Sequence, residues 1–581
     1  MKETISNKDL VVLLKEIVAA MEVKEYSFFI IRAYQNAISA IEALTMNVVD
    51  LWEDERLNTI PGIGPSISQH LSDYFETGVY PEYDEIIKDL PDGMFGLIGL
   101  RGIGAKRAYK LAQAFELTSR ASALEKIKKA AESHKIMELE GFGEKLEQQI
   151  LESITDMKKT KNEKTRLLLV HAEEIAKRVI DYMNTSPHVL NIEAMGSLRR
   201  REATVGDLDM VVATEEPEKS LAHFMKFPEI GEVLAEGDKK LSVNLKNNAQ
   251  VDIRVIEPKT FGSMVQYFTG SKQHNIVLRT YALSKKMSLS EYGIKHKGEL
   301  HEFATEEAFY NYLGLDLIPP ELRQAKNEVD LAKSHQLPDL IKASDIKGDM
   351  HMHTIASDGL NTIGEMVKAC EELGYEYMGI ADHAPSVQSR GEDEVRMMIE
   401  KQRTAVDEIN KVSNIKVLLG YEVNILADTS LSLPIEFLEM LDYVIAGIHS
   451  GFNESREQIT NRLIAAARNP FVTFISHPTG RLLNERDAYE VDWDEFFNVV
   501  KENGKVLEIN SYPDRLDLPD DLVYEAQTRG IKMIINTDAH EISHLNLMRY
   551  GADVARRGWC TKKDIVNTLP LDNFKEALKI K

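Results

Sequence analysis

Two aspartates, Asp207 and Asp209, provide the first recognisable chemistry in the sequence. They lie beside the apolar run 210–212, which predicts a strand, and side chains two residues apart on a strand point the same way. Two carboxylates on one face repel each other unless a cation lies between them, and Mg²⁺ or Mn²⁺ suits such hard oxygen ligands. Just upstream, Gly196-Ser197 can expose backbone N–H groups and the arginines at 199–201 can clamp phosphate.

A third carboxylate, Asp252, lies in the run 249–256. Apolar residues there alternate with Asp252 and Arg254, which predicts a half-buried strand with Asp252 on its polar face. Three carboxylates on adjacent strands can hold two metal ions about 3.5–4 Å apart, an arrangement suited to in-line phosphoryl transfer. The alternative is a surface strand with salt-bridged acids. The glycine–serine pair, the arginines and the second strand together favour metal-dependent nucleotidyl transfer.

A second group of metal-binding residue types occupies the C-terminal part of the chain. Strand-like apolar runs recur there, separated by helical segments, and each run ends in a potential ligand. Chemistry at the carboxyl end of successive strands indicates a (β/α) barrel. Mixed imidazole and carboxylate ligands favour Zn²⁺, Mn²⁺ or Fe²⁺ over Mg²⁺ alone. The candidate ligands are His351, His353, Asp358, His383, Glu422, His449, His477, Asp538 and His540.

Glycine pairs near the N-terminus predict another kind of site. The segments 57–71 and 99–110 each read as helix, tight turn and helix, with Gly62 and Gly64 or Gly102 and Gly104 at the turn. Glycine permits positive φ, and the N-terminus of the second helix directs free N–H groups outward. Two such copies favour contact with DNA phosphate. A third copy at 139–146 is weaker, and an ordinary turn is an equal alternative there.

Length and composition limit the possible classes of protein. A chain of 581 residues suggests several domains. Two cysteines provide no disulfide framework, and no apolar run is long enough to span a membrane, so we expect a cytoplasmic, nucleoid-associated protein. The N-terminal segment 1–21 predicts an amphipathic helix rather than a signal peptide. The net charge of −23 predicts modest, salt-sensitive DNA affinity, with backbone N–H groups supplying part of the phosphate contact.

The carboxylate motifs resemble those of the family X DNA polymerases. The resemblance is carried by Gly196-Ser197, Gly206-Asp-Leu-Asp209, Val251-Asp-Ile-Arg254 and Tyr267-Phe-Thr-Gly-Ser271. It implies that Asp207 and Asp209 bind two ions, Mg²⁺ or Mn²⁺, and that Asp252 binds only the catalytic one. Helical periodicity places Asn275 and Arg279 on one face, where a solvated surface is the alternative. The nucleotide-binding residues implied by the resemblance are Gly196, Ser197, Arg200, Tyr267, Phe268, Gly270, Asn275 and Arg279.

The histidine set resembles the PHP (polymerase and histidinol phosphatase) domain, and its nine-ligand pattern is complete here. The resemblance implies up to three ions, Mn²⁺ or Zn²⁺. The first would be held by His351, His353, Glu422 and Asp538, the second by Glu422, His449 and His477, and the third by Asp358, His383 and His540. The glycine pairs resemble helix-hairpin-helix motifs, which implies DNA binding at Gly62, Gly64, Gly102 and Gly104, with Na⁺ or K⁺ as a bound ion.

Residues 1–90 are similar to the small N-terminal domain of the eukaryotic repair polymerases. In that domain, a lysine attacks the sugar aldehyde of an abasic 5′-phosphate. Here the aligned position is His70, and Ser66 replaces a neighbouring phosphate-binding lysine. Imidazole cannot form the Schiff base that a lysine amine forms. We therefore do not expect deoxyribose-phosphate lyase activity.

Together the motifs resemble, over essentially the whole chain, the bacterial and archaeal type of family X polymerase. The predicted fold is multidomain α/β, with helical helix-hairpin-helix domains, an α+β nucleotidyltransferase palm and thumb, and a C-terminal (β/α) PHP barrel. The expected domains are N-terminal (1–90), fingers (91–155), palm (156–260), thumb (261–320), linker (321–342) and PHP barrel (343–581).

This resemblance implies a function. We expect a monomer that fills gaps in base excision repair, using gapped or primer–template DNA and dNTPs. The PHP barrel would add 3′→5′ exonuclease activity, together with abasic-site endonuclease or 3′-phosphatase activity. Two alternatives stay open: the barrel acts as a small-molecule phosphatase, or the chain is a non-catalytic scaffold that binds DNA ends.

Overall fold

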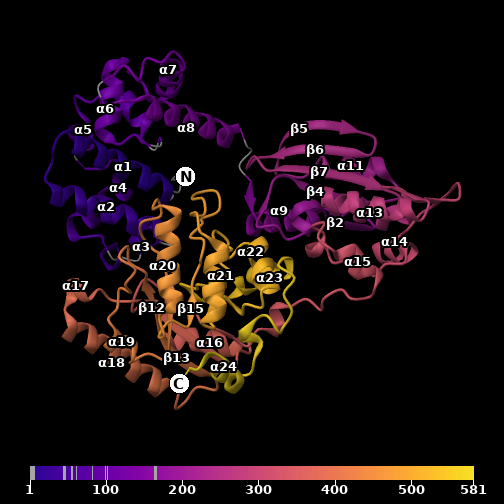
Figure 1. Cartoon of the computed structure of the whole chain (residues 1–581). Coiled ribbons are helices and arrows are strands. Elements are labelled where there is room, and N and C mark those ends of the chain that lie inside the picture. Colours follow the sequence, from indigo (N-terminus) through magenta and orange to yellow (C-terminus); the bar gives the residue numbers. More distant parts are fainter. Residues whose placement is uncertain are drawn as a thin grey trace. The chain divides into compact units, whose positions relative to one another are not determined.

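The computed structural model describes residues 7–43, 48–53, 57–60, 62–81, 83–98, 100, 102–139, 141–162 and 166–580. Pro61, Gly99, Arg101 and Glu140 of the predicted glycine motifs, and residues 1–6 of the predicted N-terminal helix, lie outside the described residues. The chain forms two compact units, Met1–Lys164 and Thr165–Lys581. Figure 1 labels their elements. In the described part of the chain, no helix is both long and apolar enough to cross a membrane.

The first unit is helical throughout its described residues. In α1, residues Leu10, Leu14, Ile17 and Met21 recur at helical spacing and are buried, so one face of this helix packs into the unit. Helix α1 contacts α2, α5 and α6. The elements are α1 (Asn7–Val23), α2 (Phe28–Ala43), α3 (Val48–Glu53), η1 (Leu57–Thr59), α4 (Pro65–Thr77), α5 (Tyr83–Ile87), η2 (Asp92–Leu97), α6 (Ala105–Ala114), α7 (Arg120–Glu132) and α8 (Glu144–Asn162).

The two glycines of each hairpin turn adopt different conformations. Gly62 and Gly102 have φ of +99° and +79°, the left-handed region that favours glycine. Gly64 and Gly104 are instead extended N-cap residues of α4 and α6, and a Cβ on either would have no heavy atom within 4 Å. The first limb of each motif is a short 3₁₀ helix, η1 or η2.

The second unit begins with a five-stranded sheet in the order β2-β4-β7-β6-β5. Strands β4 and β7 are parallel neighbours, and Asp209 pairs in register with Asp252. Strand β1 pairs with β3, and α9 begins directly after it, at Leu169. The elements are β1 (Leu167–Leu168), α9 (Leu169–Met183), β2 (Asn191–Ala194), α10 (Gly196–Arg199), β3 (Thr204–Val205), β4 (Leu208–Ala213), α11 (Pro217–Phe224), β5 (Ile230–Gly237), β6 (Lys240–Leu245) and β7 (Gln250–Ile256).

A smaller helical region with a three-stranded sheet follows. Residues 321–342, predicted as a linker, pack on this region: Leu322, Val329 and Leu340 join its hydrophobic core. Arg323 is fully buried and pairs with Glu306 at 2.6 Å, so this connection is an integral part of the region. The elements are η3 (Pro258–Thr260), α12 (Phe261–Thr269), α13 (Lys272–Ser284), β8 (Met287–Ser290), β9 (Gly293–His296), β10 (Glu299–His301), α14 (Glu306–Leu313), η4 (Pro320–Leu322) and α15 (Glu328–Lys333).

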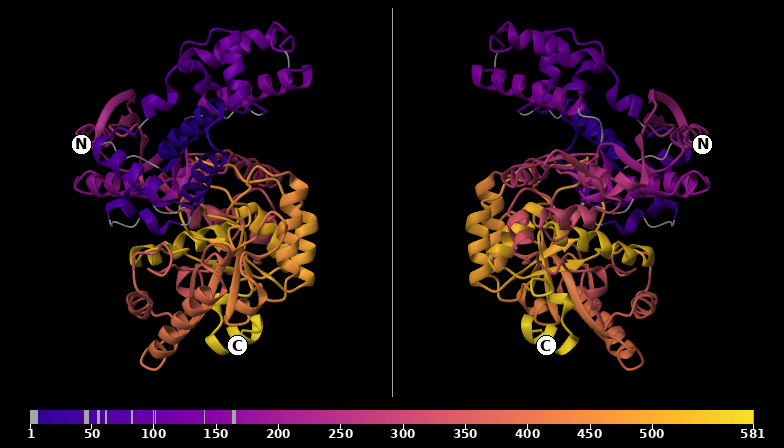
Figure 2. Two further views of the ribbon diagram at one scale, coloured as in Figure 1. Left: turned by 90° about the vertical axis from the view of Figure 1, so that its left-hand side faces the viewer. Right: turned by 90° about the vertical axis from the view of Figure 1, so that its right-hand side faces the viewer.

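The C-terminal region is a parallel seven-stranded sheet in the order β11 to β17, nearly closed into a barrel. A parallel bridge between Met352 and Ala539 joins the chain beyond β11 to the chain beyond β17. Helices lie outside the strands, and α20 and α21 pack side by side (Figures 1 and 2). The strands are β11 (Gly348–Asp349), β12 (Tyr377–His383), β13 (Lys416–Asn424), β14 (Tyr443–Gly447), β15 (Phe474–Ile475), β16 (Val506–Asn510) and β17 (Met533–Asn536).

The strand order confirms the predicted fold class. Between each pair of neighbouring parallel strands, the chain forms at least one helix or turn on the outside of the sheet. The barrel helices are η5 (Ala343–Asp345), α16 (Ile363–Glu372), α17 (Val387–Arg390), α18 (Glu392–Ile409), α19 (Ile435–Leu438), α20 (Arg456–Arg468), α21 (Trp493–Glu502), α22 (Asp520–Thr528), η6 (Ile542–Leu547), α23 (Met548–Arg557), η7 (Val566–Thr568) and α24 (Leu571–Leu578).

Helix α23 of the barrel contacts the five-stranded domain directly. Asp553 pairs with Arg201 at 2.6 Å, and the Tyr550 hydroxyl donates to Glu173 at 2.8 Å. Arg557 donates to the backbone carbonyl of Arg200, also at 2.8 Å. The barrel therefore supports the same loop that carries the predicted phosphate-binding arginines.

Candidate active sites

The five-stranded domain holds a pocket of about 510 Å³ where β4 begins. Asp207 and Asp209 both line it, although Asp207 precedes the strand and only Asp209 lies within it. Gly196 has φ +60°, and a Cβ there would lie 3.3 Å from the Asp209 carboxylate, so the glycine allows the loop to approach the acid. All eight predicted nucleotide-binding residues line the pocket: Gly196, Ser197, Arg200, Tyr267, Phe268, Gly270, Asn275 and Arg279.

The carboxylates of this pocket are crowded. Burial, and then the charges of Asp207 and Asp252, raise the pKa of Asp209 to about 6. A divalent cation would relieve that repulsion, and an all-oxygen donor set suits Mg²⁺ or Mn²⁺. The residues therefore fit a hard metal ion. When bound, such an ion supplies Lewis-acid stabilisation of phosphoryl charge and helps orient the attacking hydroxyl.

Asp252 is placed differently from the other two aspartates. Its carboxylate pairs with Lys240 at 2.7 Å, and it is not among the described residues that line the pocket. Burial alone would raise the pKa of Asp252, but the hydrogen bond from Lys240 holds it below its usual value. The structure therefore places Asp209 and Asp252 in register on adjacent strands, with Asp207 just before β4 and Asp252 engaged by Lys240.

Two further pocket residues were missed by the sequence analysis. Arg166 lines the pocket and donates to Thr204 through Nε at 2.8 Å. Glu202 also lines it and pairs with Arg200 at 2.6 Å. Arg166 could have been noticed in the sequence as a basic residue directly before the apolar run 167–170. Nothing in the local sequence distinguishes Glu202 from an ordinary surface acid.

One wall of the pocket comes from α12, which carries Tyr267 and Phe268, and from α13. Asn275 donates to the Tyr267 carbonyl at 2.8 Å and accepts from Gln266 at 3.0 Å. The Arg279 guanidinium lies 5.3 Å from the centre of the Tyr267 ring. These contacts place Asn275 and Arg279 at the pocket, where Arg279 is exposed, and the roles of both residues stay predictions.

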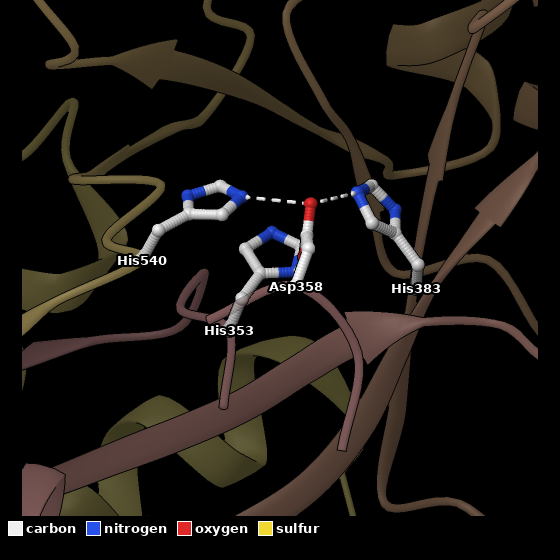
Figure 3. Close-up of side chains that lie close together, drawn as sticks. All are labelled: His353, Asp358, His383 and His540. Carbon is white, nitrogen blue, oxygen red and sulfur yellow. Dashed lines mark ion pairs between the residues drawn. The ribbon is translucent and has the colours of Figure 1, made fainter. Parts of the chain in front are cut away.

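Eight of the nine candidate ligands of the barrel lie at or just beyond strand ends. The ninth, Asp358, lies in the loop after β11. Figure 3 shows the ring nitrogens of His540 and His383 directed at the Asp358 carboxylate from two sides. Those nitrogen–oxygen distances are 3.3 and 3.4 Å. Two atoms that each lie about 2.1 Å from one tetrahedral ion are about 3.4 Å apart, so this spacing suits shared metal ligation.

The ligands form three overlapping groups. The groups are His353, Asp358, His383 and His540; His351, His353 and Asp538; and His383, Glu422 and His449. They differ from the implied sets in four respects: His353 also joins the Asp358 group, His383 joins Glu422, Glu422 is absent from the His351 group, and His477 is absent from the Glu422 group. His477 nevertheless lies 2.9 Å from the Glu422 carboxylate, so Glu422 stands between all the members of its implied set.

Unpaired buried nitrogens support a metal at this cluster. His351 Nε2, His353 Nδ1 and His477 Nδ1 are buried and make no hydrogen bond with the described residues. A buried polar atom without a partner is costly, and a metal ion would satisfy a ring nitrogen. The donors are mixed imidazole and carboxylate groups, so the residues present fit a borderline ion such as Zn²⁺ or Mn²⁺.

The imidazoles also control the charge of the carboxylates. Burial alone would raise the pKa of Asp358, but the neighbouring His383 and His540 hold it well below its usual value. The pKa of Glu422 is likewise held low, against the effect of burial, by His449 and His351. Burial, and then the charge of His540, lower the pKa of His353 to about 4. Ionised carboxylates and a neutral imidazole are the forms that bind metal.

Glu508 of β16 was missed by the sequence analysis. It is fully buried, lies 2.7 Å from His351 Nδ1, and accepts from the backbone N–H of His477 at 3.0 Å. A carboxylate on the far nitrogen of a ligand histidine fixes the ring orientation and raises its basicity. The signal was available: Glu508 is the one acid in the apolar run 506–509, and burying it requires a partner.

Comparison with known families gives matches to four segments of the chain. Residues 264–324 match the DNA polymerase beta thumb and residues 349–512 match the PHP domain. Residues 5–80 match a helix-hairpin-helix domain, and residues 96–156 match a SAM-like helix-hairpin-helix tandem. These matches, together with the carboxylate pocket and the histidine cluster of the barrel, define a nucleotidyltransferase fused to a PHP barrel.

Individual similar proteins show more specifically to which family the chain belongs. The "DNA polymerase/3'-5' exonuclease PolX" of Bacillus subtilis (strain 168) is 35% identical over 578 residues, which are 98% of this chain and 99% of that protein. The chain therefore belongs to the PolX family, the family X DNA polymerases that carry a PHP domain. A "Probable phosphatase" of Thermoanaerobacter sp. (strain X514) is 27% identical over 248 residues, covering 40% of this chain and 94% of that protein. A "Probable phosphatase" of Caldicellulosiruptor saccharolyticus is 32% identical over 167 residues, covering 28% of this chain and 65% of that protein.

Proposed function

We propose that the chain is a template-directed, gap-filling DNA polymerase whose PHP barrel is a 3′→5′ exonuclease. The observation that carries the first activity is the pocket at β4, which combines two crowded aspartates with the loop arginine Arg200 and the aromatic wall of α12. The name of the Bacillus subtilis relative supports both activities. Gapped or primer–template DNA and dNTPs would be the substrates.

In synthesis, the primer 3′-oxygen attacks the α-phosphorus of the dNTP, and its hydroxyl proton passes to water. The new P–O bond forms as the bond to the bridging oxygen breaks, and pyrophosphate leaves. Asp207, Asp209 and Asp252 would hold Mg²⁺ or Mn²⁺, and Asp252 would exchange its partner Lys240 for an ion. Ser197 and Arg200 would orient the triphosphate, while Tyr267, Phe268 and Gly270 would contact the sugar.

The exonuclease reaction would take place at the barrel. The oxygen of water attacks the phosphorus of the terminal nucleotide, and the bond to the penultimate 3′-oxygen breaks. The products are a nucleoside 5′-monophosphate and a shortened strand whose 3′-oxygen has taken up the proton. The nine ligands would hold up to three ions, Mn²⁺ or Zn²⁺, which supply an activated water and stabilise the leaving oxygen.

The combination of activities is suited to base excision repair, because gap filling needs both a clean 3′ end and a polymerase. Abasic-site endonuclease or 3′-phosphatase activity at the barrel would produce such ends. The helix-hairpin-helix glycines Gly62, Gly64, Gly102 and Gly104 would contact DNA phosphate, with Na⁺ or K⁺, because the open space at Gly64 and Gly104 allows close approach. The enzyme would act as a monomer on chromosomal DNA.

A second candidate function is hydrolysis of small phosphomonoesters by the barrel. The observation that favours it is the similarity of part of the chain to probable phosphatases. Faster release of phosphate from small phosphomonoesters than of nucleotides from DNA would support this function over the exonuclease.

The test is a gapped duplex with a labelled primer, incubated with Mn²⁺ or Mg²⁺ with and without dNTPs. We expect the primer to be extended when dNTPs are present and shortened when they are absent. A primer that stays unchanged in both reactions would overturn the proposal and favour a DNA-binding scaffold.

A further inference from the structure

A second pocket, of about 490 Å³, adjoins the barrel cluster at His383. It lies between the loops that follow β11 and β12, the N-terminus of α16 and one face of α18. Helix α18 lies on the outside of the barrel against β13 (Figure 1). The apolar part of the lining is formed by Ile355, Ile363, Pro385, Met398, Ala405 and Ile409. We call this set the apolar pocket.

The apolar pocket lies on the open side of the ligand cluster. The side chains of His383 and His449 are 28% and 14% exposed, whereas those of the other seven ligands are at most 4% exposed. A phosphodiester must therefore approach the cluster past these two histidines. Because His383 also lines the apolar pocket, a group attached to that phosphate has this cavity directly beside it.

The polar side chains at the floor of the pocket are engaged with one another. The Gln402 amide donates to Asp382 at 2.7 Å and accepts from the Tyr421 hydroxyl. Thr354 also donates to Asp382, at 2.8 Å. Groups held in such a network keep a fixed geometry. Because these polar groups bond to one another, the pocket would recognise its ligand by shape and apolar contact. It would therefore accept different bases.

The rim of the pocket carries positive charge. Lys401 lines the pocket and its residue is exposed, one position before Gln402 on α18. An ammonium group there can pair with a backbone phosphate while an apolar group fills the cavity. The ligand class that matches both features has a flat apolar face joined to anionic phosphate. A free inorganic phosphate has no part that would use the cavity.

We propose that the apolar pocket binds the nucleobase of the 3′-terminal nucleotide while the scissile phosphate lies at the cluster. The proposal rests on the exonuclease function proposed above and specifies how that site holds its substrate. The pocket volume falls within the roughly 300–1,000 Å³ typical of small-molecule sites. Bases pack well on apolar side chains whatever their sequence, since every base has a π-face.

The test compares two single-stranded oligonucleotides that differ only at the 3′ end, one with a normal terminal nucleotide and one whose terminal sugar lacks its base. Ala405→Trp in the full-length chain fills the pocket from α18. We expect it to lower kcat/KM for the normal end about ten-fold, the discrimination available from one lost apolar contact surface. On the end without a base, the same variant should match the wild type. Thr404→Trp places the same large side chain on the exposed side of α18 and should leave both substrates unaffected.

The possible results distinguish failure of the pocket proposal from failure of the exonuclease function. Equal loss on both ends would show a general disturbance, and no loss on either end would show that the base lies elsewhere, so both results overturn the pocket proposal. If the wild-type chain removes no nucleotide from either oligonucleotide, the exonuclease function fails and this inference fails with it. Should Ala405→Trp fail to fold by its circular dichroism, Ala405→Leu makes the same comparison with a smaller addition.

Discussion

The two active-site regions hold their carboxylates in opposite electrostatic states. In the five-stranded domain, Asp209 lies among other carboxylates, and its pKa is raised to about 6, first by burial and then by the charge of Asp207. In the barrel, Glu422 and Asp358 are surrounded by imidazoles that hold their pKa values well below the usual range despite burial. The first site has excess negative charge that needs an ion, whereas in the second the neighbouring imidazoles keep the buried carboxylates ionised.

The two regions also differ in how far they are assembled. The barrel ligands are almost all buried and lie within contact distance of one another. In the carboxylate pocket, Asp252 is paired with Lys240 and Arg200 with Glu202, so under the proposed function both would change partners when metal and nucleotide bind. The barrel ligands would need no such exchange of partners.

The largest expected effect separates the two sites. Asp209→Asn removes a charge that the metal needs, so we expect primer extension to fall by about 10³-fold or more. Exonuclease activity on single-stranded DNA should remain close to that of the wild type. Glu215→Gln changes an exposed acid a few residues away and should leave both activities unaffected. Loss of both activities in Asp209→Asn would contradict independent sites.

The reverse experiment is His353→Ala. His353 lies 3.2 Å from Asp538 and 3.5 Å from Asp358, so its loss removes a ligand shared by two groups. We expect nucleotide release to fall by about 10²-fold or more while extension persists. His335→Ala, at a side chain that is 73% exposed, is the matched control. Extension that fell in parallel with nucleotide release would argue for one composite site.

A smaller effect should follow from Glu508→Gln. This change keeps the shape of the side chain and weakens its hold on His351 Nδ1. Outer carboxylates of this kind typically contribute about 10–100-fold in metal affinity or activity. We expect exonuclease activity to need a correspondingly higher Mn²⁺ concentration, measured by titration, with primer extension unchanged. An unchanged Mn²⁺ titration would contradict the positioning role of Glu508.

The smallest effect tests whether the barrel supports the polymerase pocket. Arg557→Ala removes the hydrogen bond to the Arg200 carbonyl. A net hydrogen bond contributes about 0.5–1.5 kcal/mol, so we expect the KM for dNTP to rise about three- to ten-fold. Exonuclease activity should change little. Arg529→Ala, which removes pairs with Asp494 and Glu525 within the barrel, is the control and should leave KM unchanged. An unchanged KM in Arg557→Ala would show that the contact is only structural.

Much of this arrangement could be predicted from the sequence, because ligands at strand ends are encoded locally. The alternation around Asp252 and the recurring strand-to-histidine transitions correctly indicated the sheet and the barrel. The roles of the individual residues stay predictions. The Lys240–Asp252 pair and the Arg200–Glu202 pair were missed, since each acid and base also has the properties of an ordinary surface residue.

Long-range packing was the least predictable part. The charged composition of 321–342 indicated a linker, yet the buried pair between Arg323 and Glu306 joins this stretch to the preceding helical region. The contacts of α23 with Arg201 and Glu173 join residues more than 300 positions apart. Such pairs leave no periodic pattern in the sequence, because each partner is specified only by the folded structure.

The most direct test of two separate metal sites is anomalous diffraction from crystals of the chain soaked in Mn²⁺. We expect one set of peaks between Asp207 and Asp209, and a second set within the barrel cluster around Glu422 and Asp358. Peaks at neither place, with the aspartates and histidines in ordinary ion pairs, would contradict the account.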